Sequence, residues 1–146
     1  MQINQDIDVF SYSVRGYEDG VIIVNTPIQQ SLADQAGEPS ADVPRIKQER
    51  LGQSFIIAQD TLIADWPPRC LEELSETHVA ILADLHPEVV IIGTGIRLRH
   101  PSRAVLAPLI TRNIGYEIMD NAAACRTYNV LIFEGRRTAA GFIMGS

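Results

Sequence analysis

Apolar and polar residues alternate along residues 9–17, which is the pattern of a β-strand with one buried face. The turn-forming residues Glu18, Asp19 and Gly20 follow, and residues 21–24 are then continuously apolar. Two strands joined by so short a turn predict an antiparallel hairpin at the N-terminal end of the chain.

Residues 25–50 break this pattern. They are polar, and helix- and strand-breaking residues interrupt them at Pro27, Gly37, Pro39 and Pro44. The stretch is therefore predicted to be a variable polar loop with short helical turns at most. A third strand is predicted over residues 55–58, which read Phe-Ile-Ile-Ala.

The next predicted element is a helix over residues 75–86. Ser75 is a suitable N-cap, and Pro87 ends the helix because proline cannot continue it. Before this helix, Trp66 precedes two prolines, so its backbone is predicted to be extended and its ring to pack on the sheet. Spacings of three and four residues predict that one helix face is formed by His78, Ile81, Leu82 and Leu85.

The C-terminal half alternates strands and helices. Residues 89–92 are continuously apolar, as expected for a central parallel strand covered on both faces. The elements predicted after it are a helix over residues 101–113 bent by Pro108, a strand over 114–119, a helix over 121–134 capped by Asp120, and a strand over 137–144. This order requires parallel pairing with right-handed crossovers.

The predicted fold class is therefore α/β. It is a three-layer arrangement with a mixed sheet and a parallel βαβαβ core in the C-terminal half. The N-terminal antiparallel hairpin either joins an edge of that sheet or forms a small sheet of its own. We expect one domain over residues 1–146, because a chain of this length builds one hydrophobic core and hardly two.

Charge is distributed unevenly along the chain. The formal net charge is -6, which argues against a general nucleic-acid-binding protein. Residues 1–60 hold nine acidic and four basic residues, whereas residues 61–146 hold nine and eight. The arginines of the second part cluster at Arg97, Arg99 and Arg103, and again at Arg126, Arg136 and Arg137. The acidic total therefore leaves room for a local anion site in the second part.

Cysteine and histidine usage predicts no metal site and no cofactor. Cys70 and Cys125 are too few for a disulfide framework or a zinc site, and the three histidines have no ligand spacing. Cys125 is predicted to be a small packing residue. No apolar run approaches the roughly 20 residues of a membrane span, and no signal peptide is recognised. The expected location is therefore cytoplasmic.

The segment Gly93-Thr94-Gly95 is a candidate ligand-binding turn. It follows the predicted central strand, and open α/β sheets bind ligands beyond the carboxyl ends of their strands. Arg97 and its basic neighbours would attract a phosphate or carboxylate. The phosphate-binding motif is incomplete, because Arg97 and Leu98 follow where a further glycine is needed. A tight strand-to-helix turn with a solvated arginine face is the alternative.

Arg126 and Asn129 are the other two candidate pocket residues. They are three positions apart on the predicted long helix and therefore share a face. They could bind a ligand near the glycine turn, or they could tie the helix to neighbouring backbone carbonyls.

The chain resembles a widespread family of small proteins that includes the mitochondrial complex I (NADH dehydrogenase) assembly factor 3. The resemblance covers roughly residues 8–144, except the unmatched 28–50, and it is most specific over 87–137. The segments that carry it are 87–95, 106–109, 121–131 and 134–137. Positions that recur in the family are Gly93, Thr94, Gly95, Arg126, Thr127, Tyr128 and Asn129.

This resemblance implies a three-layer α/β fold and no established enzymatic activity. It favours a non-enzymatic assembly or interaction factor for a respiratory membrane complex, peripheral to the inner membrane, with a protein partner there. The competing hypothesis is a small-molecule or anion-binding protein, which includes the possibility of an enzyme, using the glycine turn with Arg97 and Arg126. The sequence leaves the oligomeric state open.

Overall fold

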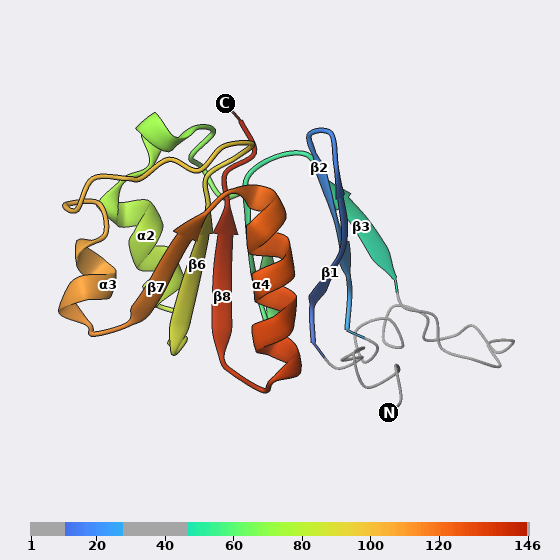
Figure 1. Ribbon diagram of the computed structural model, residues 1–146. Coiled ribbons are helices and arrows are strands. Elements are labelled where there is room, and N and C mark those ends of the chain that lie inside the picture. The colour runs from blue at the N-terminus through green and yellow to red at the C-terminus, as the bar shows by residue number, and fades with distance from the viewer. Residues whose placement is uncertain (1–10, 28–46, 146) are drawn as a thin grey trace, which may run out of the picture.

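A computed structural model describes residues 11–27 and 47–145 of the chain, which form two β-sheets and several helices (Figure 1). The strands are β1 (Ser13–Glu18), β2 (Val21–Asn25), β3 (Gln48–Leu51), β4 (Phe55–Ala58), β5 (Thr61–Ile63), β6 (Val89–Gly93), β7 (Gly115–Met119) and β8 (Thr138–Phe142). The helical elements are the 3-10 turn η2 (Leu71–Glu73) and the α-helices α2 (Glu76–Ala83), α3 (Ala107–Thr111) and α4 (Asn121–Phe133).

The larger sheet has five strands in the order β5-β4-β8-β6-β7. Strand β6 is parallel to both β7 and β8, and its Val89 lies opposite Gly115 on one side and Thr138 on the other. Strand β4 is antiparallel to β8 and to β5. The predicted mixed sheet with a parallel βαβαβ core is therefore confirmed.

The N-terminal hairpin forms a separate sheet with the strand order β1-β2-β3, so the second of the two predicted arrangements is correct. Strand β3 overlaps the end of the predicted 25–50 loop, and that prediction is wrong for residues 48–50. Residues 48–50 are exposed and polar, and the strand exists because its backbone pairs with β2, with Leu51 opposite Ile22. No local pattern shows such a pairing. Residues 28–46 lie outside the described residues.

Successive residues of the central strands enter two hydrophobic cores, one on each face of the five-stranded sheet. Helix α4 covers one face, and helices α2 and α3 cover the other together with Trp66 (Figure 1). The three-stranded sheet packs on the outer side of α4 and shares its core. The predicted three-layer α/β fold is thus confirmed, with the small sheet added outside the helix.

Helix α2 begins as predicted and ends early. The Ser75 side chain accepts a hydrogen bond from the His78 N–H, and the His78 ring accepts one from the Ser75 N–H. The helix ends at Ala83 and not at His86, because the His86 N–H bonds three residues back to Ala83. His86 then adopts a left-handed φ of 56° before Pro87. The buried face is also rotated from the prediction and consists of Val79, Leu82 and Ala83.

The predicted helix over residues 101–113 is wrong for more than half of its length. Only Ala107–Thr111 is helical, and residues 102–107 form successive turns closed by hydrogen bonds from residue i+3 to residue i. Pro108 explains the difference, because proline lacks an N–H and fits only in a first helical turn. The helix therefore starts at Ala107 with this proline in its first turn, and it is not bent by it.

The remaining C-terminal predictions are confirmed. The Asp120 side chain caps α4 by accepting a hydrogen bond from the Ala123 N–H, and Gly135 follows the helix with a left-handed φ of 80°.

The Trp66 prediction is also confirmed, because Trp66 is 3% exposed and packs on the sheet at Gly141. Strand β5 has no counterpart in the sequence analysis, because three residues are too few to show a pattern.

Candidate functional site

The Gly93-Thr94-Gly95 turn lies beyond the carboxyl end of β6, as predicted, and Asn121 at the start of α4 holds it closed. The Gly95 N–H donates to the Asn121 Oδ1 at 3.1 Å, and the Asn121 N–H donates to the Gly95 carbonyl at 2.8 Å. The Asn121 Nδ2 also donates to the Ile143 carbonyl at 3.0 Å. Gly93 must be glycine because a Cβ there would overlap the Asn121 Oδ1.

Thr94 fixes the segment that leaves this turn. Its hydroxyl donates to the Arg97 carbonyl at 2.7 Å and accepts from the Arg99 N–H at 3.1 Å. The Thr94 N–H donates to the Met119 carbonyl on β7. The N–H groups of Thr94, Gly95 and Arg99 are therefore satisfied inside the protein and do not point at a ligand. Positive charge for an anion would have to come from the arginine side chains of this segment.

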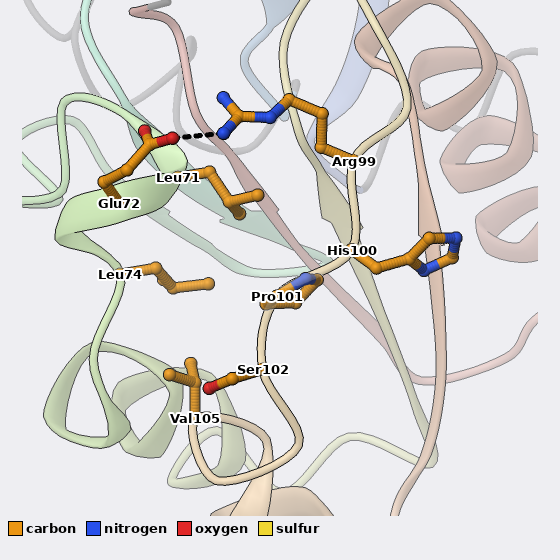
Figure 2. Close-up of a pocket in the computed structure, with 8 residues that line it drawn as sticks. All are labelled: Leu71, Glu72, Leu74, Arg99, His100, Pro101, Ser102 and Val105. Carbon is orange, nitrogen blue, oxygen red and sulfur yellow. Dashed lines mark hydrogen bonds and ion pairs between the residues drawn. The ribbon is translucent and has the colours of Figure 1, made fainter.

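Two hollows flank Arg99 at this end of the sheet. One, of about 280 Å³, is lined by Thr94, Ile96, Arg97, Arg99 and Gly145. The other, of about 290 Å³, lies between η2 and residues 99–105 (Figure 2). Figure 2 shows that Leu71, Leu74 and Val105 point into the second hollow, whereas the His100 ring points away from it.

Glu72 of η2 forms an ion pair with Arg99 across the rim of the second hollow (Figure 2). Hydrogen bonding to Arg99 lowers the pKa of the Glu72 carboxyl and raises the pKa of the Arg99 guanidinium. Both side chains are largely exposed. Glu72 and Arg99 are 27 residues apart, so no local sequence signal indicates their contact.

Asn129 is a structural residue of the α4–β1 contact. Its Oδ1 accepts a hydrogen bond from the Val14 N–H at 2.9 Å, and its Nδ2 donates to the Val14 carbonyl at 2.8 Å. Asn129 lies eight positions after Asn121 on the helix, a distance of about 12 Å along the helix axis. The structure therefore gives Asn129 contacts with β1 and none with the glycine turn.

Arg126 is exposed on α4, and within residues 11–27 and 47–145 it has no hydrogen bond or ion pair. Of the six candidate pocket residues, the structure thus brings together Gly93, Thr94, Gly95 and Arg97, and it does not bring Asn129 to them. Asn121 is the residue of this region that sequence reasoning missed as a contact. The sequence does contain a signal for this contact. Asn121 directly follows the capping residue Asp120, which places it at the start of the helix after β7.

Ile96 and Leu98 are a second feature that the sequence analysis missed. Ile96 is 84% exposed and Leu98 51%, although both follow a buried turn. They alternate with Arg97 and Arg99. The hydrogen bonds of Thr94 fix the backbone of this segment, so the two aliphatic side chains are held in water by a rigid support.

Cys125 packs in the core as predicted and is not an activated thiol. It is 6% exposed, and burial raises the pKa of its thiol to about 12, with Arg126 only partly opposing this. At neutral pH the thiol is therefore protonated. Across the described parts of the chain, no three His, Cys, Asp or Glu side chains are arranged to hold a metal ion.

Comparison with known proteins identifies the family. The profile of the family described as "Protein of unknown function (DUF498/DUF598)" matches residues 39–143, which include the glycine turn, Asn121 and all of α4. The chain belongs to this family. The match starts inside the 28–50 stretch that the sequence resemblance left out. It confirms that resemblance over the C-terminal half, where it is most specific.

The human protein named NADH dehydrogenase [ubiquinone] 1 alpha subcomplex assembly factor 3 is similar to this chain. The two are 32% identical over 83 residues, which are 56% of this chain and 45% of the human protein. The bovine protein of the same name gives the same values. The chain therefore spans about half the length of the curated relatives it matches.

A solved structure supports the fold over nearly the whole chain. A Xanthomonas campestris protein solved by NMR is 35% identical and superposes with a TM-score of 0.69, covering 99% of this chain and 90% of that one. In the described parts of this chain, no helix is long and apolar enough to cross a membrane.

Proposed function

We propose that this protein is an assembly or interaction factor for a respiratory membrane complex and that it acts by binding and not by catalysis. Two kinds of observation support the proposal. Relatives that share 32% identity over 83 residues carry the name of an assembly factor of NADH dehydrogenase. The chain also presents a rigid surface suited to contact with another protein.

The exposed aliphatic pair Ile96 and Leu98 is the observation that carries the proposal. Large aliphatic side chains at high exposure cost free energy in water, and burial against a partner recovers it. Thr94 fixes their backbone in advance, so binding loses little conformational entropy. We further propose that the protein is cytoplasmic and reaches the periphery of the inner membrane by binding its partner.

Affinity capture from detergent-solubilised membranes of the source organism tests this function. We expect the tagged protein to enrich subunits of a respiratory complex, identified by mass spectrometry. The double variant Ile96→Asp/Leu98→Asp should lose most of this enrichment, because it places charge where apolar contact is needed. Val130→Asp is the matched control, since Val130 is 53% exposed on α4. Equal capture by the double variant, or no enriched respiratory subunit, would contradict the proposal.

A second candidate function is the binding of a small anion, which could extend to catalysis on it. The hollow of about 280 Å³ that contains Thr94, Arg97 and Arg99 favours it. Arg97 has no ion pair within the described ranges, so its guanidinium is available to a phosphate or carboxylate.

A thermal-shift panel of chloride, phosphate and nucleotides at millimolar concentration tests the anion site. Phosphate should raise Tm by about 2 °C or more, because a ligand that binds only the folded state stabilises it. Arg97→Ala should remove the shift. Arg126→Ala should keep the shift, because Arg126 does not line this hollow. If none of the anions changes Tm, the second candidate function is wrong.

A further inference from the structure

The two hollows beside Arg99 are adjacent, because Arg99 lines both of them, and together they form one candidate binding surface. Small-molecule sites usually occupy at least about 300 Å³. Each hollow falls just below that size, at about 280 and 290 Å³. Neither hollow alone suits a large cofactor. Two adjacent hollows of this size suit successive side chains of an extended peptide.

The stretch of chain that forms one side of this surface is basic and contains no acidic residue. Residues 89–116 contain no aspartate or glutamate, although the whole chain has a net charge of -6. The same stretch contains Arg97, Arg99, Arg103 and Arg112. Arg112 is paired with Asp84 on the C-cap of α2. Among the described residues, Arg97 and Arg103 have no such partner and are free to bind a carboxylate from outside.

Glu72 already occupies Arg99 in the way that an external carboxylate would. It approaches from η2, on the opposite rim of the hollow, and it is the acidic residue seen among the lining side chains (Figure 2). Its side chain is 62% exposed, and an ion pair between exposed side chains adds little net stability. Another carboxylate can therefore displace Glu72 at small cost.

The second hollow offers an apolar site directly beside that ion pair. Leu74 is buried, Leu71 and Val105 are half-buried, and all three point into the hollow (Figure 2). An aliphatic side chain inserted there would contact these three apolar side chains. A site for an acidic side chain and a site for an aliphatic side chain are therefore adjacent on this surface.

We propose that this surface binds an acidic segment of a partner protein. A carboxylate of that segment takes the place of Glu72 on Arg99, and an aliphatic side chain enters the hollow lined by Leu71, Leu74 and Val105. The inference rests on the proposed interaction function, and it specifies the chemistry of the partner. A second carboxylate in the segment pairs with Arg97.

A peptide fits these observations better than an anionic bilayer does. A bilayer meets a whole face of the protein at once, and its charge is repelled by the net charge of -6. Glu73, which is exposed, directly follows the lining residue Glu72 in η2 and adds negative charge on this side. A peptide can follow the hollows and contact the arginines alone.

Selection of random-sequence peptides displayed on phage against the purified protein tests the inference. We expect the enriched peptides to combine aspartate or glutamate with an aliphatic residue. The most enriched peptide is then synthesised and its Kd measured by fluorescence polarisation. Arg97→Glu/Arg99→Glu should weaken binding by about tenfold or more, since charge reversal replaces attraction with repulsion. Arg15→Glu/Arg50→Glu is the control for the change in net charge, because it makes the same two charge reversals at residues exposed on β1 and β3.

A variant that gains affinity for the peptide tests the role of Glu72 more specifically than a variant that loses affinity. Glu72→Gln removes the competing carboxylate and should tighten binding by about threefold. Glu73→Gln is its matched control, because Glu73 lies on the same turn but pairs with Arg69. Thermal melts monitored by circular dichroism verify that each variant is folded.

Three outcomes would overturn the inference. The first is a set of enriched peptides with no excess of acidic residues over the unselected library. The second is an unchanged Kd in Arg97→Glu/Arg99→Glu. The third combines two results. The protein co-sediments with vesicles of phosphatidylcholine and phosphatidylglycerol and loses this binding in Ile96→Asp, and no peptide binds selectively. Each is measured on the purified protein, so it is separate from a failure to capture respiratory subunits.

Discussion

Replacing Asn121 with alanine should lower the free energy of unfolding by about 2–4 kcal/mol. The buried amide satisfies the Gly95 N–H and the Ile143 carbonyl, and its loss leaves both groups without these partners. Urea unfolding followed by circular dichroism gives the change in free energy. Amide hydrogen exchange at Gly95 should become faster, because this N–H loses its acceptor.

Asn129→Ala is the matched control for this variant. It also removes an amide that makes two backbone hydrogen bonds, but Asn129 is half-buried whereas Asn121 is buried. Its cost should be smaller, and the Gly95 amide should exchange as in the parent protein. A loss below about 1 kcal/mol in Asn121→Ala would show that the turn does not depend on this amide.

Replacing Trp66 with alanine should cost about 3–5 kcal/mol, the range for truncating a large buried aromatic side chain. The Trp66 ring fills the core on the α2 side of the sheet, and its Nε1 donates to the His78 carbonyl at 3.2 Å. Differential scanning calorimetry is the suitable measurement, because the variant has no tryptophan fluorescence. Trp66→Phe should cost less, since it keeps an aromatic ring in the same space.

Gly141 provides an internal check on this explanation. A Cβ at Gly141 would lie 2.7 Å from the Trp66 Cη2 and 3.2 Å from the Leu82 Cδ1. Gly141→Ala should therefore be destabilising alone and better tolerated when Trp66 is alanine. Additive costs in the double variant would mean that the two residues are not in direct steric contact.

The sequence predicts those parts of the fold whose signals are local. Asp120 and Ser75 mark the starts of α4 and α2, the apolar run at residues 89–92 marks the central strand, and Gly135 marks the end of α4. The order of strands and helices then fixes the parallel core. These features depend on residues within a few positions of one another.

The errors arise where distant residues decide the structure. Strand β3 is polar and exists only through its pairing with β2. Pro108 is a different case, because it is a local signal that fits either a bend or a first helical turn, and the structure has it in the first turn of a short helix. At the candidate site, the contacts of Asn129 with Val14 and of Arg99 with Glu72 link residues 115 and 27 positions apart. Nothing in the local pattern distinguishes a ligand-facing asparagine from one that holds two elements together.

The central place of β8 has a consequence for how the chain folds during synthesis. This strand lies between β4 and β6 in the five-stranded sheet, yet it is made after both of them. Until residues 138–142 have left the ribosome, β4 and β6 have no neighbour on that side, and their backbone edges are open to pairing with other chains. The nascent chain is therefore most open to aggregation in the interval before β8 is made.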